Sequence, residues 1–323
     1  MPHILVVGAL HADAMAQLDA RPDVTYETVA DAGEAELIAR AAGADAFTVR
    51  TQRIPAAVID AAPALKVVSR HGVGYDNVDL AALDRRGIPL TVTATANAVT
   101  VAEHSLSLML ALAKHTIAFD AAVRGDRWGD RLSRQAWELA ERTLLIVGFG
   151  RIGRELAARA RAFGMDVVVY DPFVDAAAAA AAGVGHAPDL MAALEAADVV
   201  SLHLPRTPET EGLIGAAELA AMRPTAVLIN AARGGLIDEA ALAAALKAGE
   251  IAGAGLDTFA VEPPAADHPL FALDNVVLSP HIGGVTGESL RRMGLETVAN
   301  TLAALDGALD PAVVVNRQVL GQA

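Results

Sequence analysis

Side chains that can do chemistry stand at or shortly after the ends of apolar runs in the second half of the chain. They include an arginine, a carboxylate and an imidazole, at Arg233, Glu262 and His281. If the runs are parallel strands, these side chains share the edge where open α/β sheets bind ligands. An arginine can bind a carboxylate through two parallel hydrogen bonds. An imidazole beside a carboxylate can give a proton to a developing alkoxide. The three residue types therefore suit hydride transfer to a 2-oxo acid.

Three glycines precede these residues at G-x-G-x-x-G spacing, namely Gly148, Gly150 and Gly153. An apolar run at 144–147 comes before them and a helical pattern at 154–163 follows. The first glycine permits a tight turn, the second lets a pyrophosphate approach the backbone, and the third lets the helix pack against the strand. The helix N-terminus then offers N–H groups to the phosphates. This unit predicts dinucleotide binding, and the alternative is that the glycines serve only close packing.

An acidic residue, Asp171, ends the next predicted strand at 167–170. Its carboxylate can accept hydrogen bonds from ribose hydroxyls, and its charge would repel the 2′-phosphate of NADP. No arginine or lysine follows Asp171 within three residues. The sequence therefore predicts NAD rather than NADP.

Two more strand ends carry polar residues. His203 and Thr207 stand in the segment LHLPRTP, and Asp257 ends the segment GLD. We expect His203 to orient a neighbour rather than to act as an acid. Four other histidines have no metal-ligand spacing, namely His104, His115, His186 and His268. We interpret them as surface or hydrogen-bonded side chains, and no metal site is predicted.

The first part of the chain alternates strand and helix, which is a doubly wound α/β pattern. The predicted strands are 4–7, 24–29, 46–49, 65–69 and 89–92, with helices near 11–20, 33–42, 55–61 and 79–86.

A glycine turn follows the fourth of these strands, in the segment HGVGYDN at 71–77. Its two glycines would leave N–H groups free to hold an anion. The alternative is an ordinary turn before a helix capped by Asp76 or Asn77. His71 could contact a substrate or be structural. Arg53, nearby, could meet a distal phosphate group or lie on the surface.

The second part of the chain begins with a predicted long helix at 97–123. Its length suits either a connection between two domains or packing against a twin helix in a dimer. A polar, irregular segment at 124–142 is interpreted as a surface excursion. From Thr143 a second α/β run predicts a dinucleotide-binding domain of six or seven strands. Its later strands are 198–202, 226–230, 253–257 and 276–279, with helices near 189–196, 215–221 and 239–248; a helix at 287–306 and an extended tail at 312–316 follow.

Composition limits the class of partner. The net charge is −14 and the pI is near 5.0, which argues against nucleic acid or an anionic membrane surface. The absence of cysteine excludes disulfide frameworks and thiolate metal sites. No signal-peptide pattern or apolar run of about 18 residues is visible, so we expect a cytoplasmic protein.

Motifs along nearly the whole chain resemble those of the D-isomer-specific 2-hydroxyacid dehydrogenase family, the group of D-3-phosphoglycerate dehydrogenase, glycerate dehydrogenase and hydroxypyruvate reductase. Besides the glycine fingerprint, the motifs are GVGYDNVD at 72–79, ANAVTVAEH at 96–104, HLPRTPET at 203–210, NAARGGLID at 230–238 and SPHIGG at 279–284.

The resemblance implies a role for each matching residue. Arg233 would bind the substrate, His281 would donate and accept the proton, and Glu262 would be its partner. Val73 and Gly74 would hold the substrate carboxylate through backbone N–H groups. The positions implied for the cofactor are Thr100, Gly148, Gly150, Arg151, Ile152, Gly153, Asp171, Thr207, Ala231, Arg233, Asp257, His281, Gly283 and Gly284.

The fold class we predict is α/β, with two doubly wound parallel-sheet domains. A Rossmann NAD-binding domain, 99–289, would be inserted in a flavodoxin-like substrate domain, 1–98 and 290–323, with the active site between them. The function predicted is NAD-dependent interconversion of a (D)-2-hydroxy acid and its 2-oxo acid by a homodimer. Candidate substrates are hydroxypyruvate, glyoxylate or 3-phosphoglycerate. The alternative is an NAD-sensing, corepressor-like binding protein without significant turnover.

Overall fold

A computed structural model describes residues 1–321 of the chain. The chain divides into two compact units: unit 1 consists of Met1–Asn97 and the C-terminal segment from Val285, and unit 2 is Ala98–Gly284. The first segment of the predicted substrate domain ends at 98, and that of unit 1 ends at 97. The second segment was predicted to begin at 290, and that of unit 1 begins at 285.

Unit 1 contains a sheet of five parallel strands in the order β2-β1-β3-β4-β5. This order is the flavodoxin-like one. The strands are β1 (His3–Val7), β2 (Thr25–Val29), β3 (Ala46–Val49), β4 (Val67–Arg70) and β5 (Leu90–Val92).

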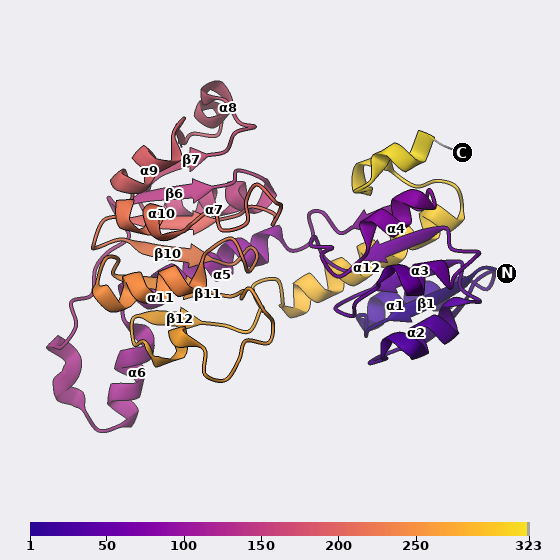
Figure 1. Cartoon of the computed structure of the whole chain (residues 1–323), viewed down its shortest axis with the longest axis horizontal. Coiled ribbons are helices and arrows are strands. Elements are labelled where there is room, and N and C mark those ends of the chain that lie inside the picture. Colours follow the sequence, from indigo (N-terminus) through magenta and orange to yellow (C-terminus); the bar gives the residue numbers. More distant parts are fainter. Residues whose placement is uncertain (322–323) are drawn as a thin grey trace. The chain divides into compact units, whose positions relative to one another are not determined.

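Helices cover both faces of this sheet (Figure 1). On one face the core is completed by α2 (Glu34–Ala41), α3 (Ala56–Asp60) and α4 (Leu80–Arg85). On the other it is completed by α1 (Ala12–Asp19) and by α12 (Gly287–Leu305), which comes from the far end of the sequence. Because both faces of the sheet are buried, strands such as β1 and β3 are nearly continuous apolar runs, which is why their positions could be predicted, whereas the edge strand β2 is mostly polar.

Unit 2 contains seven parallel strands in the order β12-β11-β10-β9-β6-β7-β8. Counted from the first strand of the unit, the order 3-2-1-4-5-6 is that of a Rossmann fold, with one more strand at the edge. The strand order reverses between β6 and β9, and ligands of such sheets bind at this switch point. The strands are β6 (Thr143–Val147), β7 (Asp166–Tyr170), β8 (Gly185–His186), β9 (Val199–Leu202), β10 (Val227–Asn230), β11 (Gly253–Leu256) and β12 (Val276–Leu278).

Two helical layers enclose the sheet of unit 2. One layer contains α5 (Ala98–Ala113) and α7 (Arg151–Ala162), whose apolar residues share one core with the sheet. The opposite layer contains α9 (Leu190–Ala196), α10 (Ala216–Ala221) and α11 (Glu239–Ala248). The alanine run forms α8 (Ala176–Ala181) beside β8. Figure 1 shows the strands stacked from β12 to β7, with their helices on either side.

The prediction of one long helix at 97–123 is wrong. The helix ends at Ala113, and α6 (Thr116–Arg124) leaves at an angle of 60°. His115, between the two helices, has a left-handed backbone with φ of 50°. The carbonyl of Ala113 accepts a hydrogen bond from the Trp137 amide at 3.0 Å, and the Lys114 ammonium donates to the Trp137 carbonyl at 2.7 Å. The returning chain therefore takes over the bonding that a continuous helix would have made.

The excursion predicted at 124–142 projects from unit 2 and contains a short 3₁₀ helix, η1 (Trp128–Leu132) (Figure 1). The tail differs from its prediction at the start, because Pro311–Val313 forms a 3₁₀ turn before Val315 donates to the Leu90 carbonyl at 2.8 Å. Two further short 3₁₀ helices are Pro269–Ala272 and Arg317–Gly321. Within residues 1–321 no single helix is long and apolar enough to cross a membrane; only α5 and α6 together reach that length and composition.

Candidate active site

The three fingerprint glycines of unit 2 stand in different surroundings. Gly148 follows β6 with φ of 95°, and a Cβ there would lie 2.6 Å from the carbonyl oxygen of His203. A Cβ on Gly153 would overlap the carbonyl oxygen of Gly148 and press on Ile146. A Cβ on Gly150 would meet none of the described atoms within 4 Å. The first and third glycines are therefore required by packing, whereas the second leaves open space in front of the backbone.

The helix that follows begins at this open position. Gly150 is the N-cap residue of α7, and among the described residues no side chain caps the helix. The first N–H groups of α7 are thus left for an anion, and the helix dipole adds a partial positive charge. Arg151 is exposed and Ile152 is half-buried at the same terminus. These features fit the pyrophosphate of a dinucleotide.

Asp171 holds the glycine turn in place, which sequence reasoning did not foresee. One carboxylate oxygen accepts a hydrogen bond from the Phe149 amide at 2.7 Å, and the other accepts from the Phe173 amide at 2.9 Å. Each oxygen keeps a further lone pair, so the half-buried carboxylate can still accept bonds from hydroxyl groups.

His203 lies on the other side of the switch point, after β9. Its Nε2 is 2.8 Å from the Ser201 hydroxyl, and its Nδ1 is buried with no hydrogen-bond partner among residues 1–321. Burial lowers the pKa of His203 to about 4. The ring is therefore neutral near pH 7, which fits the expected orienting role rather than that of an acid. Thr207, further along this loop, binds Thr210 through its amide at 2.8 Å.

The loop after β10 carries Arg233. Asn230 closes this loop by donating from its side-chain amide to the Arg233 carbonyl at 2.8 Å and accepting from the Ala232 amide at 3.0 Å. The Arg233 guanidinium is half-buried and donates to the Ala232 carbonyl at 2.6 Å. A Cβ on Gly234 would overlap the carbonyl of Phe259. This close backbone approach places the arginine loop directly against the loop that leads to Glu262.

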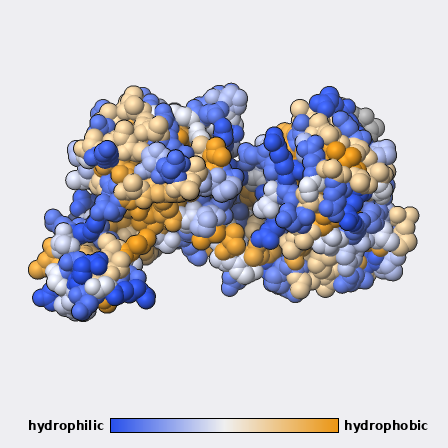
Figure 2. Space-filling view, turned by 60° about the horizontal axis from the view of Figure 1, so that its bottom comes forward, coloured by the Kyte–Doolittle hydropathy of each residue, from blue (hydrophilic) through white to orange (hydrophobic). Residues whose placement is uncertain are grey.

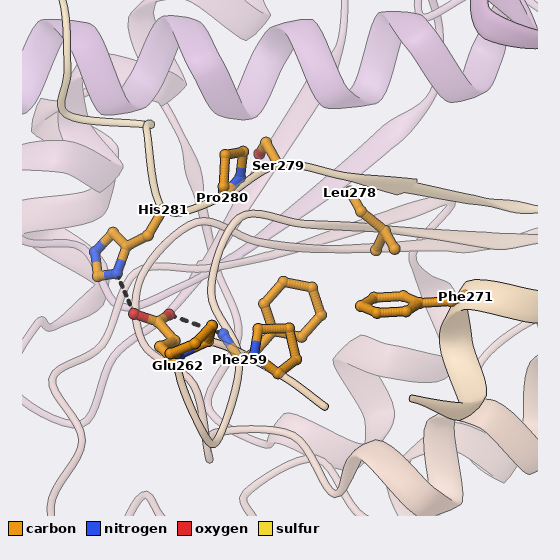
Figure 3. Close-up of a pocket in the computed structure, with 9 residues that line it drawn as sticks. Phe259, Glu262, Phe271, Leu278, Ser279, Pro280 and His281 are labelled. Atoms are coloured by element: carbon orange, nitrogen blue, oxygen red, sulfur yellow. Dashed lines mark hydrogen bonds and ion pairs between the residues drawn. The ribbon is translucent and has the colours of Figure 1, made fainter. Parts of the chain in front are cut away.

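Glu262 and His281 form a hydrogen-bonded pair in unit 2. His281 Nδ1 lies 2.7 Å from one carboxylate oxygen of Glu262, and the other oxygen accepts from the Phe259 amide at 3.0 Å (Figure 3). Burial alone would raise the pKa of Glu262, but the hydrogen bonds from His281 and Phe259 and the imidazole charge outweigh it and lower that pKa. Glu262 is thus a carboxylate above mildly acidic pH, and it fixes the ring of His281 through Nδ1.

A pocket of about 430 Å³ lies beside this pair. Figure 3 shows Phe259, Phe271 and Leu278 gathered on one side of Glu262, while the ring of His281 stands on the other. The Nδ1 edge of the imidazole faces Glu262, and the ring points away from the phenylalanines. Glu262 and His281 themselves also line this pocket.

His281 belongs to a loop that is bonded to a buried carboxylate. Its own backbone is left-handed, with φ of 54°, a strain that costs on the order of 1–3 kcal/mol. Asp257, 1% exposed, accepts from the amides of Ile282 at 2.9 Å and Gly283 at 2.7 Å and from the Ser279 hydroxyl at 2.6 Å. Its carbonyl also accepts from the His281 amide at 2.8 Å. Asp257 thus holds the loop in place through these four hydrogen bonds.

Electrostatics keep Asp257 ionised in this position. Burial alone would raise its pKa, but hydrogen bonds from His104, Ser279 and two backbone amides outweigh that effect and lower it. His104, on α5, lies with Nε2 2.9 Å from the Ser279 hydroxyl and 3.3 Å from Asp257. No sequence pattern predicts this contact, because 175 positions separate His104 from Ser279.

The glycine turn of unit 1 follows β4. Gly72 has φ of 129°, and its amide donates to the Thr93 hydroxyl at 3.0 Å. Arg70 donates to the Asn77 side chain at 3.0 Å and to the carbonyl of His71. Asn77 therefore belongs to the turn, and the cap of α4 is Asp79, which accepts from Ala82.

His71 in this turn is buried, and burial together with the charges of Arg50 and Arg70 lowers its pKa to about 4. Val73 and Gly74 are half-buried, and Arg53 is exposed.

The structure brings some of the predicted site residues of unit 2 into contact and leaves others apart. Glu262 is bonded to His281, Gly283 to Asp257, and Gly148 packs against His203. Ala231 and Thr100 are buried in their own elements, and Gly284 is half-buried at the end of unit 2. Within residues 1–321 no group of three or more histidine, aspartate or glutamate side chains is arranged to hold a metal ion.

Comparison with known proteins agrees with this geometry. Residues 106–283 match the family model described as D-isomer specific 2-hydroxyacid dehydrogenase, NAD binding domain. The chain belongs to the D-isomer specific 2-hydroxyacid dehydrogenase family. The resemblance inferred from the motifs is thereby confirmed, and so is the α/β fold class with two parallel sheets.

Three relatives show how far the similarity extends. The D-3-phosphoglycerate dehydrogenase of Mycobacterium tuberculosis is 42% identical over 97% of this chain and 59% of its own. The glyoxylate reductase of Korarchaeum cryptofilum is 40% identical over 88% of this chain and 86% of its own. The NADPH-dependent glyoxylate/hydroxypyruvate reductase of Sinorhizobium meliloti, solved with NADP and malonate, has a TM-score of 0.83 and 30% identity, over 98% and 97% of the two chains.

These matches differ in how much of each relative they cover. The chain spans 59% of the length of the M. tuberculosis phosphoglycerate dehydrogenase and 49% of that of Archaeoglobus fulgidus, but nearly the whole S. meliloti reductase. The S. meliloti relative is NADPH-dependent and was solved with NADP. The family comparison therefore supports binding of NAD or NADP, without choosing between them.

Proposed function

We propose that this protein is a dehydrogenase that interconverts a (D)-2-hydroxy acid and its 2-oxo acid with NAD. The observation that carries the proposal is the 2.7 Å hydrogen bond between His281 and Glu262 in a domain that matches the NAD-binding domain of this family. Arg233 supports it, because its loop packs directly on the backbone before Glu262.

His281 would act as general acid in reduction and as general base in oxidation. The Glu262 carboxylate accepts a hydrogen bond from the Nδ1–H group of His281. The second ring nitrogen is therefore the one that can exchange a proton with the substrate oxygen. Arg233 would bind the substrate carboxylate through its guanidinium and so orient the carbonyl. A bound nicotinamide cofactor supplies or takes the hydride. Val73 and Gly74, from unit 1, would hold the carboxylate through backbone N–H groups.

The cofactor would bind at the switch point of unit 2. Its pyrophosphate would lie over Gly150 at the N-terminus of α7, close to Arg151 and Ile152, and its adenosine ribose would reach Asp171. The loop residues Thr207, Ala231, Asp257 and Gly283 or Gly284 would line the remaining path, with Thr100 facing the cofactor from α5. NAD is favoured because the Asp171 charge would repel a 2′-phosphate.

Turnover assays test the reaction. We expect NADH oxidation with at least one acid among hydroxypyruvate, glyoxylate, pyruvate, branched 2-oxo acids and 3-phosphohydroxypyruvate. His281→Ala should lower kcat by about 10²–10⁴-fold while NADH binding persists. Arg233→Ala should lose most activity in kcat/KM, and Arg124→Ala, on exposed α6, should behave as wild type. Wild-type turnover by both site variants would refute the proposal. NADH binding without turnover of any acid would favour the NAD-sensing alternative.

The same assays discriminate between substrates and between cofactors. If the substrate carries a phosphate, Arg53→Ala should raise KM for 3-phosphohydroxypyruvate and leave KM for glyoxylate unchanged. If it does not, neither value should move. Repeating the assays with NADPH tests whether Asp171 selects NAD. We expect a higher kcat/KM with NADH than with NADPH, and a smaller ratio of the two values in Asp171→Asn. Equal or better rates with NADPH in the wild type would overturn the assignment of NAD.

A homodimer is proposed from the excursion of unit 2. Two of its large apolar residues stand in solvent, with Trp128 68% and Leu132 86% exposed. Figure 2 shows hydrophobic residues on this projecting part and where it leaves the unit. Contiguous exposed apolar surface marks interaction sites, and a second copy of the chain would cover it. Light scattering should give twice the chain mass, and Trp128→Ser with Leu132→Ser should give the monomer mass.

A further inference from the structure

His104 is a half-buried imidazole that the proposed reaction does not use. It lies on α5, and its Nε2 is 2.9 Å from the Ser279 hydroxyl and 3.3 Å from a carboxylate oxygen of Asp257. Its Cδ2 atom also lies against Gly283, since a Cβ on that glycine would be 3.2 Å away. The imidazole therefore touches the loop 279–283 at both ends.

The hydrogen-bond directions in this cluster follow from the donors available. The Asp257 carboxylate is ionised and can only accept. The Ser279 hydroxyl has one proton and gives it to Asp257 across 2.6 Å. Ser279 must then accept at 2.9 Å, so the donor is the Nε2–H group of His104. His104, Ser279 and Asp257 thus form one chain of hydrogen bonds that begins on α5.

This chain ends at the backbone of the proposed acid. Asp257 accepts from the amides of Ile282 and Gly283, and its carbonyl accepts from the amide of His281. His281 has a left-handed backbone, which a residue with a side chain rarely adopts without support. The bonds to Asp257 supply that support on both sides of the strained residue.

We propose that His104 is a positioning residue for catalysis: through Ser279 and Asp257 it fixes the loop that presents His281. The proposal rests on the proposed function, because the role of His281 belongs to it. His104 touches neither Glu262 nor the proposed acid directly, and it acts only by holding the loop. A misplacement of about 1 Å at the reacting groups lowers a rate by on the order of 10²-fold.

Four variants test this chain of hydrogen bonds. His104→Leu removes the donor and keeps an apolar side chain of similar bulk, and His104→Gln returns an N–H donor near Nε2. Ser279→Ala removes the middle of the chain. Glu103→Gln, on the exposed face of the same helix, is the matched control. We expect His104→Leu to lower kcat by roughly ten- to a hundredfold with a smaller change in KM. His104→Gln should recover most of that loss, and the control should match wild type.

A double-mutant cycle separates this role from a general loss of structure. If His104 acts through Ser279, the combined His104→Leu and Ser279→Ala variant should be little worse than either alone. Additive losses of kcat would overturn the proposal, as would a His104→Gln variant no better than His104→Leu. Unchanged kcat in His104→Leu would overturn it as well.

Amide hydrogen exchange decides the point without activity. The amides of Ile282 and Gly283 should exchange faster in His104→Leu than in wild type, and at the wild-type rate in His104→Gln. Equal protection in all variants would overturn the positioning role. If the wild type reduces no 2-oxo acid at all, the proposed function fails, and the exchange rates still decide whether His104 fixes the loop.

Discussion

Each unit carries a glycine turn at the carboxyl end of a central parallel strand, and the two turns differ in the charges that surround them. In unit 1, Gly72 follows β4 beside the guanidinium of Arg70. In unit 2, Gly148 follows β6, and the next residue donates its amide to the Asp171 carboxylate. The first turn lies close to the positive charges of Arg50 and Arg70, which would attract a carboxylate. The second combines a helix N-terminus for a pyrophosphate with an anion for a ribose.

A histidine adjoins each turn, buried in unit 1 and half-buried in unit 2. His71 directly precedes Gly72, and the carbonyl of His203 packs against Gly148. Both rings have a pKa of about 4, but the causes differ. Burial alone lowers the pKa of His203, whereas His71 also faces the charges of Arg50 and Arg70. The same neutral state thus arises mainly from burial in both units, and two arginines add to it in unit 1.

The largest effect we expect comes from filling the packed end of the unit 2 turn. A Cβ on Gly153 would overlap the carbonyl of Gly148 and press on Ile146, both of which are backbone or core. Gly153→Ala should therefore lower the free energy of unfolding by about 3 kcal/mol, in the upper range for overpacking, and abolish NADH binding. Urea unfolding and fluorescence titration with NADH measure the two effects.

Its control is Gly87→Ala in unit 1. Unlike Gly153, which lies inside α7, Gly87 is at positive φ, and a Cβ there would meet none of the described atoms within 4 Å. That variant should cost only the backbone strain, about 1 kcal/mol, and leave NADH binding intact. A Gly153→Ala protein as stable as the Gly87→Ala protein would show that α7 does not need the close approach.

The histidines beside the two turns predict the next largest effect, a dependence of stability on pH. The pKa of His203 falls from the usual value of about 6.5 to about 4 in the folded protein. Between these values the unfolded chain binds a proton that the folded chain does not, so the free energy of unfolding falls as pH falls. At pH 5 the loss is about 2 kcal/mol for one such histidine. It is absent above pH 7.

Unfolding of unit 2 can be followed by tryptophan fluorescence, because Trp128 and Trp137 both lie in that unit. Between pH 7 and pH 5 we expect the urea midpoint to fall in wild type. The fall should be smaller in His203→Gln, whose amide can still reach Ser201. If the urea midpoint of His203→Gln falls as far as that of wild type, folding does not lower the pKa of His203, and the ring is protonated in the folded protein at pH 5.

Much of the fold could be predicted because both sheets are buried on two faces. Runs such as 4–7 and 144–147 are apolar at every position, so these strands could be predicted from their own residues alone. The break of α5 at His115 could not be predicted, because its cause is the return of Trp137 from 23 residues further along the chain. The strand β8 was missed because Gly185 and His186 carry no apolar pattern.

The candidate site divides in the same way. The pairing of Glu262 with His281 followed from family motifs, and it also lies within 19 positions of the sequence. The support of His281 by Asp257 and His104 did not follow from any motif. His104 is one histidine on an apolar helix, and only the packing of α5 against β11 and β12 brings it to the loop. Sequence motifs identify the proposed reacting groups more readily than the groups that hold them.

The smallest effect we expect is also the most selective one, and it concerns the glycine that faces open space. A Cβ on Gly150 would meet none of the described atoms within 4 Å, and its φ of −72° suits any residue. Gly150→Ala should therefore leave the urea midpoint unchanged, since neither packing nor backbone is disturbed. The added methyl would stand where the pyrophosphate must approach the N-terminus of α7, so the Kd for NADH should rise about tenfold, or 1.4 kcal/mol. A variant that binds NADH as wild type does would mean that the phosphates lie elsewhere, and the comparison of the two turns would lose its basis.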